Sequence, residues 1–265
     1  MILFEAERNF TEQTKNTCIL SLFLKLLFGG YTAQTKCAAS WQLALNSFVR
    51  IIKMRQGEIQ DMSGTDYNGT QYQITSWCKR MLRDHVKDGA FCIDATMGNG
   101  NDTQYLCELA GVNGHVLAFD IQDIAVERTR ERLEKHLPFC NYELILDSHS
   151  HLRNYAEPES VDCIVFNLGY LPSGDHSVAT RPDTTLSAIG QGLELLKPGG
   201  MMSICIYSGG DSGFEEKESV LSYLKGLDVK KYLVLVTEYY NRPNHPPIPA
   251  FVIRLGGKNG PGMQG

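Results

Sequence analysis

The chain has 265 residues, of which 43% are apolar and 9% aromatic, so it is long enough to bury one sizeable core. Its formal net charge of -5 excludes a uniformly basic surface, so a nucleic-acid partner would need a local basic patch. Its eight cysteines include no Cys-x-x-Cys pair and several lie in apolar runs, which favours reduced core cysteines over disulfides or metal ligands.

Residues 1–60 are expected to form an extension that precedes the folded domain. Between residues 13 and 57 there is no Asp or Glu but there are six Lys or Arg residues, a composition typical of organelle import leaders. The apolar stretch 18–28 is interrupted by a lysine and is shorter than the roughly 18 residues that span a bilayer, so we expect no transmembrane helix. Two alternatives are an upstream translation artefact, with Met54 or Met62 as the true start, and a partner-binding helix. We expect a chloroplast or mitochondrial location if the leader is real, and a cytoplasmic one otherwise.

The polar, turn-rich residues 61–70 predict a linker, with the folded domain over 71–256 and a flexible tail over 257–265. Within the domain, short apolar runs bounded by turn residues predict seven strands. These strands are 91–95, 116–120, 142–146, 163–167, 201–207, 232–239 and 250–255. Helices are predicted between them at 75–87, 102–110, 123–136, 185–196 and 213–226, the fourth ending at the stop signal Lys197-Pro-Gly-Gly200.

Strands that alternate with helices predict βαβ units and a mostly parallel sheet, hence a Rossmann-like α/β fold. The last two strands are joined by only about ten residues rich in Pro and Asn, which is too few for a helical crossover. We therefore expect these two strands to form an antiparallel hairpin at one side of the sheet.

A glycine-rich turn, Asp94-Ala-Thr-Met-Gly-Asn-Gly-Asn-Asp102-Thr103, follows the first predicted strand and directly precedes a predicted helix. Glycines allow the backbone to approach a ligand closely. A dinucleotide fingerprint would need a third glycine where Thr103 stands, and Asp102 lies where a pyrophosphate would sit, which argues against a NAD-dependent oxidoreductase. Carboxylates suit a cationic sulfonium and an ammonium better. A purely structural turn is the alternative.

The next two strands also end in polar residues. Asp120 ends the second strand, 26 positions after Asp94, where a carboxylate can accept both hydroxyls of a ribose. NAD enzymes use the same device, so Asp120 indicates a nucleoside without saying which one. The third strand ends at Asp147-Ser-His149, which by itself predicts a turn capped by Asp and Ser.

The fourth predicted strand ends at Asn167-Leu-Gly169-Tyr170, at the edge where α/β sheets bind ligands. This segment resembles the Asn-Pro-Pro-Tyr type turn of amino methyltransferases, in which an amide and a carbonyl hydrogen-bond the target amine. Such chemistry needs orientation and the loss of one proton rather than a strong nucleophile.

Six strings together resemble the MnmM (YtqB-like) family, first labelled rRNA methylases. They are Asp94-Ala-Thr-Met-Gly-Asn-Gly100, Phe119-Asp-Ile-Gln122, Phe166-Asn-Leu-Gly-Tyr-Leu-Pro172, Thr184-Thr185, Lys197-Pro-Gly-Gly200 and Asn241-x-x-Asn-x-Pro-Pro247. The resemblance spans 74–255 and implies a class I S-adenosylmethionine-dependent methyltransferase with a seven-stranded, mostly parallel sheet. It also implies the substrate, the aminomethyl nitrogen of 5-aminomethyl-2-thiouridine at the tRNA wobble position. A methyltransferase of rRNA or of a small molecule, and a catalytically silent cofactor-binding relative, are the alternatives.

Carried over position by position, the resemblance places the cofactor against Asn99, Asn101, Asp102, Asp120, Gln122, Ser148 and His149. It places Asn167, Gly169 and Tyr170 near the transferred methyl group as candidate catalytic residues. One departure is that a family string containing two histidines stands here as Tyr207-Ser208-Gly209-Gly210-Asp211, without either of them. Asp211 is a candidate catalytic residue in place of these histidines. Because the histidines are missing, a catalytically silent relative stays an alternative.

A tRNA partner would need basic residues, and two groups are candidates. Arg242, in the loop 241–248, could contact a phosphate, with a solvated arginine as the alternative. A second candidate patch comprises Lys217, Lys225, Lys230 and Lys231. We expect no metal site, because the histidines are scattered, and no membrane partner. A homodimer is one assembly that the sequence allows.

Overall fold

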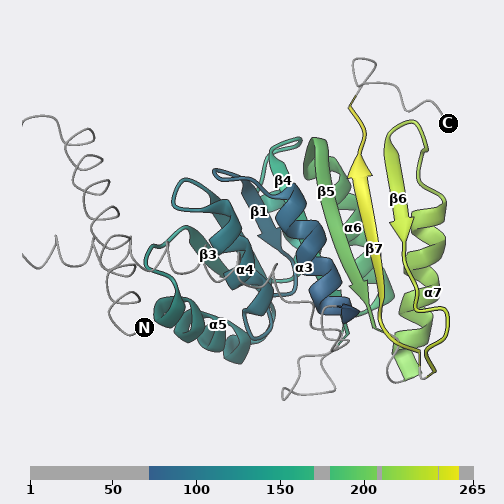
Figure 1. Ribbon diagram of the computed structural model, residues 1–265, viewed down its shortest axis with the longest axis horizontal. Coiled ribbons are helices and arrows are strands. Elements are labelled where there is room, and N and C mark those ends of the chain that lie inside the picture. The colour runs from purple at the N-terminus through teal and green to yellow at the C-terminus, as the bar shows by residue number, and fades with distance from the viewer. Residues whose placement is uncertain (1–71, 170–179, 208–210, 244, 257–265) are drawn as a thin grey trace, which may run out of the picture. The chain divides into compact units, whose positions relative to one another are not determined.

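The computed structural model describes residues 72–169, 180–207, 211–243 and 245–256, which form one sheet with helices on both faces (Figure 1). The strands are β1 (Phe91–Asp94), β2 (His115–Asp120), β3 (Tyr142–Leu146), β4 (Val161–Leu168), β5 (Leu196–Ile206), β6 (Tyr232–Val236) and β7 (Ile248–Arg254). The helices are α3 (Ile74–His85), α4 (Asn101–Ala110), α5 (Asp123–His136), the 3-10 helix η2 (His149–Asn154), α6 (Pro182–Leu195) and α7 (Asp211–Lys225). None of the helices in these ranges is long and apolar enough to cross a membrane.

The sheet has seven strands in the order β3-β2-β1-β4-β5-β7-β6. The strands β1 to β5 pair in parallel, and β7 runs antiparallel to both β5 and β6. The predicted sheet and its C-terminal antiparallel hairpin are therefore confirmed, with β7 lying inside the sheet and β6 at its edge. The strand order reverses between β1 and β4, and in such sheets ligands bind outside the carboxyl ends of the strands at this point.

The two faces of the sheet are covered by different helices (Figure 1). One apolar cluster packs α3, α4 and α5 against the sheet, and it includes Leu82, Leu106 and Leu133. The other packs η2, α6 and α7 against the opposite face and includes Leu152 and Ile189. Because the central strands are buried on both sides, their middle residues form short apolar runs, such as 163–166 of β4, rather than an alternating pattern.

Several predicted boundaries differ from the structure, and two of the differences have a clear physical reason. The strand β5 begins at Leu196, so the segment 197–200 that was predicted to follow a helix as a stop signal lies within the strand. Its pairing with β4 shifts register between Val161 and Cys163, and Lys197 donates hydrogen bonds to the Asp162 carboxylate there. The helix α6 begins at Pro182 rather than residue 185, because proline's fixed φ suits the first helical turn.

Candidate active site

The turn after β1 is held in place from beneath by Asp94. This carboxylate is fully buried, and it accepts hydrogen bonds from the Thr103 hydroxyl at 2.7 Å and from the Thr96 amide at 3.1 Å. The amide of Met97 donates to the carbonyl of Phe119 on β2 at 2.9 Å. The turn is therefore tied to its own helix and to the neighbouring strand, which leaves its outer side available to a ligand.

Burial, together with the nearby charges of Asp102 and Asp120, raises the pKa of Asp94 to about 7. Burial also raises the pKa of Asp120. Three carboxyl groups thus lie close enough to repel one another, and a bound cation would relieve that repulsion. This part of the structure fits a positively charged ligand and disfavours a phosphate.

Asp120 lies at the end of β2 and is bound to the same turn. Its Oδ2 accepts a hydrogen bond from the Gly98 amide at 3.0 Å, and its Oδ1 accepts one from the Gln122 amide at 3.0 Å. Each oxygen can accept a further hydrogen bond. The carboxylate is therefore fixed in an orientation that suits two neighbouring hydroxyl groups.

Asn167 links the end of β4 to the helix that follows β1. Its side-chain Nδ2 donates to Asp102 Oδ2 at 2.8 Å, and its backbone amide donates to the Thr96 hydroxyl at 2.7 Å. The opposite orientation of the Asn167 side-chain amide would place its oxygen against an oxygen of Asp102. The side-chain nitrogen of Asn167 is therefore the atom that faces Asp102. The carbonyl oxygen of Asn167 is then the acceptor that remains for a ligand.

A cavity of about 540 Å³ lies above these groups. Its lining includes five predicted residues, Asn99, Asn101, Asp102, Asn167 and Gly169. The other predicted cofactor residues, Asp120, Gln122, Ser148 and His149, follow β2 and β3 at the same edge of the sheet and are not among the residues that line it. The structure thus gathers the predicted glycine-rich turn and the predicted Asn-Leu-Gly turn around one space.

Four further residues of the prediction lie partly or wholly outside the described part of the chain. Tyr170, Ser208 and Gly210 fall outside it. Asp211 begins α7, but its side chain is also outside what the structure describes. The suggested role of Asp211 as a substitute for the missing histidines therefore stays a prediction.

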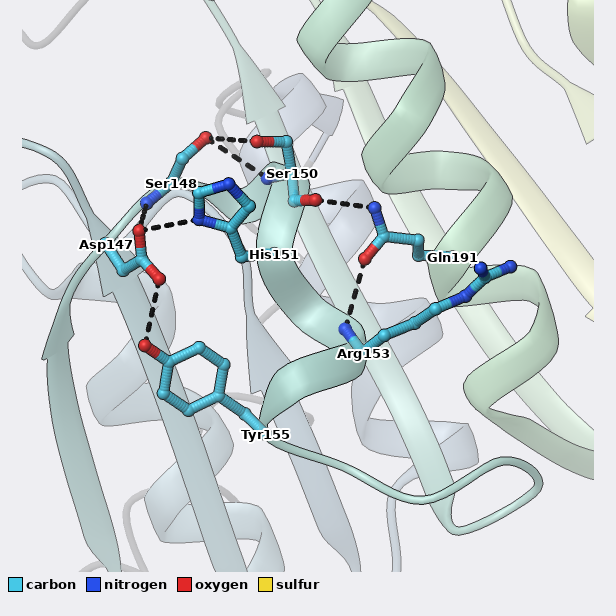
Figure 2. A network of polar contacts seen from close by, with 7 residues as sticks. All are labelled: Asp147, Ser148, Ser150, His151, Arg153, Tyr155 and Gln191. Atoms are coloured by element: carbon cyan, nitrogen blue, oxygen red, sulfur yellow. Dashed lines mark hydrogen bonds and ion pairs between the residues drawn. The ribbon is translucent and has the colours of Figure 1, made fainter.

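The residues after β3 form a polar network around Asp147 (Figure 2). Asp147 Oδ1 accepts from the Ser148 amide at 2.7 Å and lies 2.8 Å from His151 Nδ1, while its Oδ2 accepts from the Tyr155 hydroxyl at 2.9 Å. The Ser148 hydroxyl accepts a hydrogen bond from the Ser150 amide at 3.2 Å and so caps η2. The sequence alternative of a turn capped by Asp and Ser is what the structure shows here.

His149 is the first residue of η2 and lies against the core. Its ring packs edge-on to Phe166, with 6.1 Å between the ring centres. Burial lowers the pKa of His149, which keeps its imidazole neutral. Its Nε2 is buried and has no hydrogen-bond partner among the described residues, which is costly and often marks a functional site.

Among the lining residues that were not predicted as site residues, three lie outside the two predicted turns. Thr75 and Lys79 come from α3, and Tyr207 directly follows β5. Burial raises the pKa of Tyr207, so its phenol stays protonated. Nothing in the order of the chain brings α3 to this space, whereas Tyr207 could have been found because it follows a predicted strand at the same edge as Asn167.

A second missed group fixes the turn that follows Asn167. The amide of Gly169 donates to the Thr180 hydroxyl at 2.8 Å, and its carbonyl accepts from the Thr180 amide at 2.9 Å. The hydroxyls of Thr180 and Thr185 donate to the carboxylate of Glu216 at 2.7 and 2.6 Å, and Glu216 is buried. Glu216 on α7 therefore holds the point where the chain leaves the sheet and the point where it returns.

We expect Glu216→Ala to lower the free energy of unfolding by about 1–3 kcal/mol, because the buried Thr185 hydroxyl and the partly buried Thr180 hydroxyl would lose their acceptor. Urea denaturation followed by circular dichroism measures this. The matched control is Glu218→Ala, an exposed carboxylate on the same helix, whose effect should stay within about 0.5 kcal/mol. Equal effects of the two substitutions would contradict a supporting role for Glu216.

The chain matches the family model described as "Putative rRNA methylase" over residues 116–253. The protein named tRNA (mnm(5)s(2)U34)-methyltransferase, chloroplastic, from Arabidopsis thaliana is 38% identical over 170 residues, which make up 61% of this chain and 62% of that protein. The chain therefore spans less than two thirds of the length of this curated relative.

Two solved structures are matched over almost their whole length. A "putative rRNA-methylase" from Clostridium thermocellum is 44% identical with a TM-score of 0.67, and the match covers 69% of this chain and 98% of that one. A "putative methyltransferase" from Streptococcus mutans, solved in complex with SAH, is 40% identical with a TM-score of 0.62. That match covers 68% of this chain and 97% of the other.

Proposed function

The chain belongs to the family described as "Putative rRNA methylase", and from this membership we propose that it is an S-adenosylmethionine-dependent N-methyltransferase of tRNA. The proposed substrate is the aminomethyl nitrogen of 5-aminomethyl-2-thiouridine at the wobble position. The name of the Arabidopsis relative supports this substrate. The observation in this chain that carries the proposal is the hydrogen-bonded pair of Asn167 and Asp102 at the border of one cavity.

The residues around the cavity fit S-adenosylmethionine, which when bound supplies an electrophilic methyl group on a positively charged sulfur. The positively charged end of S-adenosylmethionine would be held by Asp102, with Asn99 and Asn101 beside it, because a cluster of carboxyl groups favours a cation. Asp120 would accept the ribose hydroxyls, and the segment at Ser148 and His149 would lie nearest the base. The complex of the Streptococcus mutans relative with SAH supports this assignment.

Asn167 would orient the target amine. Its amide nitrogen is held by Asp102, so its carbonyl oxygen can accept an N–H of the amine and direct the nitrogen lone pair into the cavity. The amine must be neutral to react, so one proton leaves it before or during formation of the nitrogen–carbon bond. The carbon–sulfur bond breaks in the same displacement, and S-adenosylhomocysteine is the product.

The direct test offers the full chain isotope-labelled S-adenosylmethionine and tRNA that carries 5-aminomethyl-2-thiouridine, with mass spectrometry of the nucleosides. Formation of the methylaminomethyl nucleoside supports the proposal. Label in ribosomal RNA or a small molecule instead would move the substrate to another class. Cofactor binding without transfer to any RNA would indicate a catalytically silent relative. This alternative is considered because the two family histidines are missing after Tyr207.

We expect S-adenosylmethionine to bind more weakly as the pH falls below about 7, because Asp94 then becomes protonated and its negative charge is lost. If the bound cation lowers the pKa of Asp94 by one pH unit, the affinity for S-adenosylmethionine should fall by about tenfold in total between high and low pH. Isothermal titration calorimetry between pH 6 and 8 measures it. S-adenosylhomocysteine carries one positive charge less, so it should depend less on pH, and Asp94→Asn should flatten both profiles.

We also propose that residues 1–60 are an organelle targeting leader. The support is their basic composition without acidic residues between 13 and 57, together with the chloroplastic name of the Arabidopsis relative. A fusion of residues 1–60 to a fluorescent protein should enter plastids or mitochondria. Uniform fluorescence in the cytosol would contradict the proposal.

A further inference from the structure

A second cavity, of about 390 Å³, lies between α7 and the loop that joins β6 to β7. Its lining carries Lys217 from α7 and Tyr239, Arg242 and His245 from the loop, together with one acidic residue, Glu238. Its two permanent cations outnumber its single carboxylate, on a chain whose formal net charge is -5. The cavity therefore favours an anionic ligand that the rest of the surface would repel.

The register of the sheet places this cavity at the same edge as the candidate active site. Leu168 pairs with Ile206 on β5, and Ile206 pairs with Ile248, the first residue of β7. Neighbouring strands lie about 4.8 Å apart, so the start of β7 is about 10 Å across the sheet from Leu168. A polymer whose reacting group enters the first cavity would pass over the second within the length of one or two nucleotides.

One described residue of the loop that lines the cavity has an uncommon backbone conformation. His245 lies in the left-handed region with φ 46°, which is uncommon for a residue other than glycine and is often found at functional positions. Its ring contacts Phe214 of α7 edge-on, with 5.4 Å between the ring centres. Tyr240 is fully exposed beside the cavity wall, and Tyr239 forms part of that wall. Aromatic faces beside cations are the usual means of binding an unstacked base and its phosphate.

We propose that this cavity binds a phosphate of the RNA substrate, with the neighbouring base against the tyrosines, at a nucleotide adjacent to the one that is methylated. Lys217 and Arg242 contact the phosphate, and this inference rests on the proposed function. The structure also divides the lysine patch predicted from the sequence. Lys230 and Lys231 precede β6, whose first residue pairs with Arg254 at the end of β7 that lies farthest from the cavity. They therefore take no part in this contact.

The test compares two double variants of the full chain that remove the same charge. Lys217→Ala with Arg242→Ala alters the cavity, and Lys230→Ala with Lys231→Ala alters exposed lysines at the opposite edge. For the cavity variant, we expect the KM for tRNA to rise at least tenfold, with kcat and S-adenosylmethionine affinity unchanged. The slope of log affinity for tRNA against log salt should become shallower by about 1, because the two cations together neutralise one phosphate.

The controls separate failure of this inference from failure of the proposed function. If the wild-type chain methylates tRNA and both double variants raise the KM equally, the cavity is not a specific RNA contact and the inference is overturned. If the wild-type chain neither binds nor methylates any RNA, the proposed function fails and the inference fails with it. A rise in KM confined to the cavity variant, with a reduced salt slope, supports the inference.

Discussion

An Asn167→Ala variant is expected to transfer methyl groups about 100- to 1000-fold more slowly than the wild-type chain, which corresponds to about 2.7–4 kcal/mol of transition-state stabilisation. The reason is that the substitution removes the carbonyl oxygen that would orient the amine, and leaves Asp102 without the donor that lies 2.8 Å away. Single-turnover transfer from labelled S-adenosylmethionine measures the chemical step directly. Cofactor affinity should change only severalfold, because the loss falls on the substrate side.

Two controls show whether this loss is specific to orientation. Asn141→Ala removes a buried amide that donates to the carbonyls of Cys107 and Gly111, so it should lower stability while the folded protein keeps its activity. The exchange variant Asp102→Asn with Asn167→Asp keeps a hydrogen bond but places a charge against the amine. If this exchange variant were fully active, a charged carboxylate would serve at position 167 as well as the neutral amide of Asn167 does.

A Gly100→Ala variant is expected to lose about 2–5 kcal/mol of folding free energy and to bind S-adenosylmethionine poorly. Gly100 has φ 73° immediately before α4, a conformation that costs other residues about 1–2 kcal/mol. An added Cβ would also lie 2.8 Å from the side chain of Thr129 and 3.1 Å from its Cα, and such overpacking costs about 1–3 kcal/mol more. Thermal and urea unfolding measure the stability, and calorimetry measures the binding.

Gly199→Ala separates the two causes of this effect. Gly199 has φ 85°, but a Cβ there would meet no atom within 4 Å, so only the backbone cost applies. We expect a loss of about 1–2 kcal/mol with unchanged cofactor binding. Equal destabilisation at the two glycines would show that contact with α5 does not matter at Gly100.

The fold could be predicted from sequence because its signals are local. Buried parallel strands such as β1 and β4 contain short apolar runs, and the connections between them are long enough for helices. The boundaries that failed depend on contacts made elsewhere. The extension of β5 to Leu196 is set by pairing with Val161 and by the contact of Lys197 with Asp162, neither of which has a signature in the order of residues.

The candidate site was predictable only where a residue follows a strand. Asp102 and Asn167 could be found because Asp102 lies in the first turn of the helix that follows β1, and Asn167 lies at the carboxyl end of β4, which is next to β1 in the sheet. The contributions of Lys79 and Glu216 could not, because helices reach the site through packing rather than through position in the chain. Glu216 in particular looks like any other acidic residue of a charged helix until burial and two threonine partners are seen.

The hydrogen bond between Asn167 and Asp102 joins the first turn of α4, which would face the cofactor, to the end of β4, which would face the RNA. If binding of the cofactor favours the hydrogen-bonded state and so changes the affinity for RNA by some factor, thermodynamic linkage requires RNA to change the affinity for the cofactor by the same factor. Cofactor and RNA would then each strengthen or weaken the binding of the other by an equal amount. A substitution at either end of this bond would consequently change both affinities and the cooperativity between them.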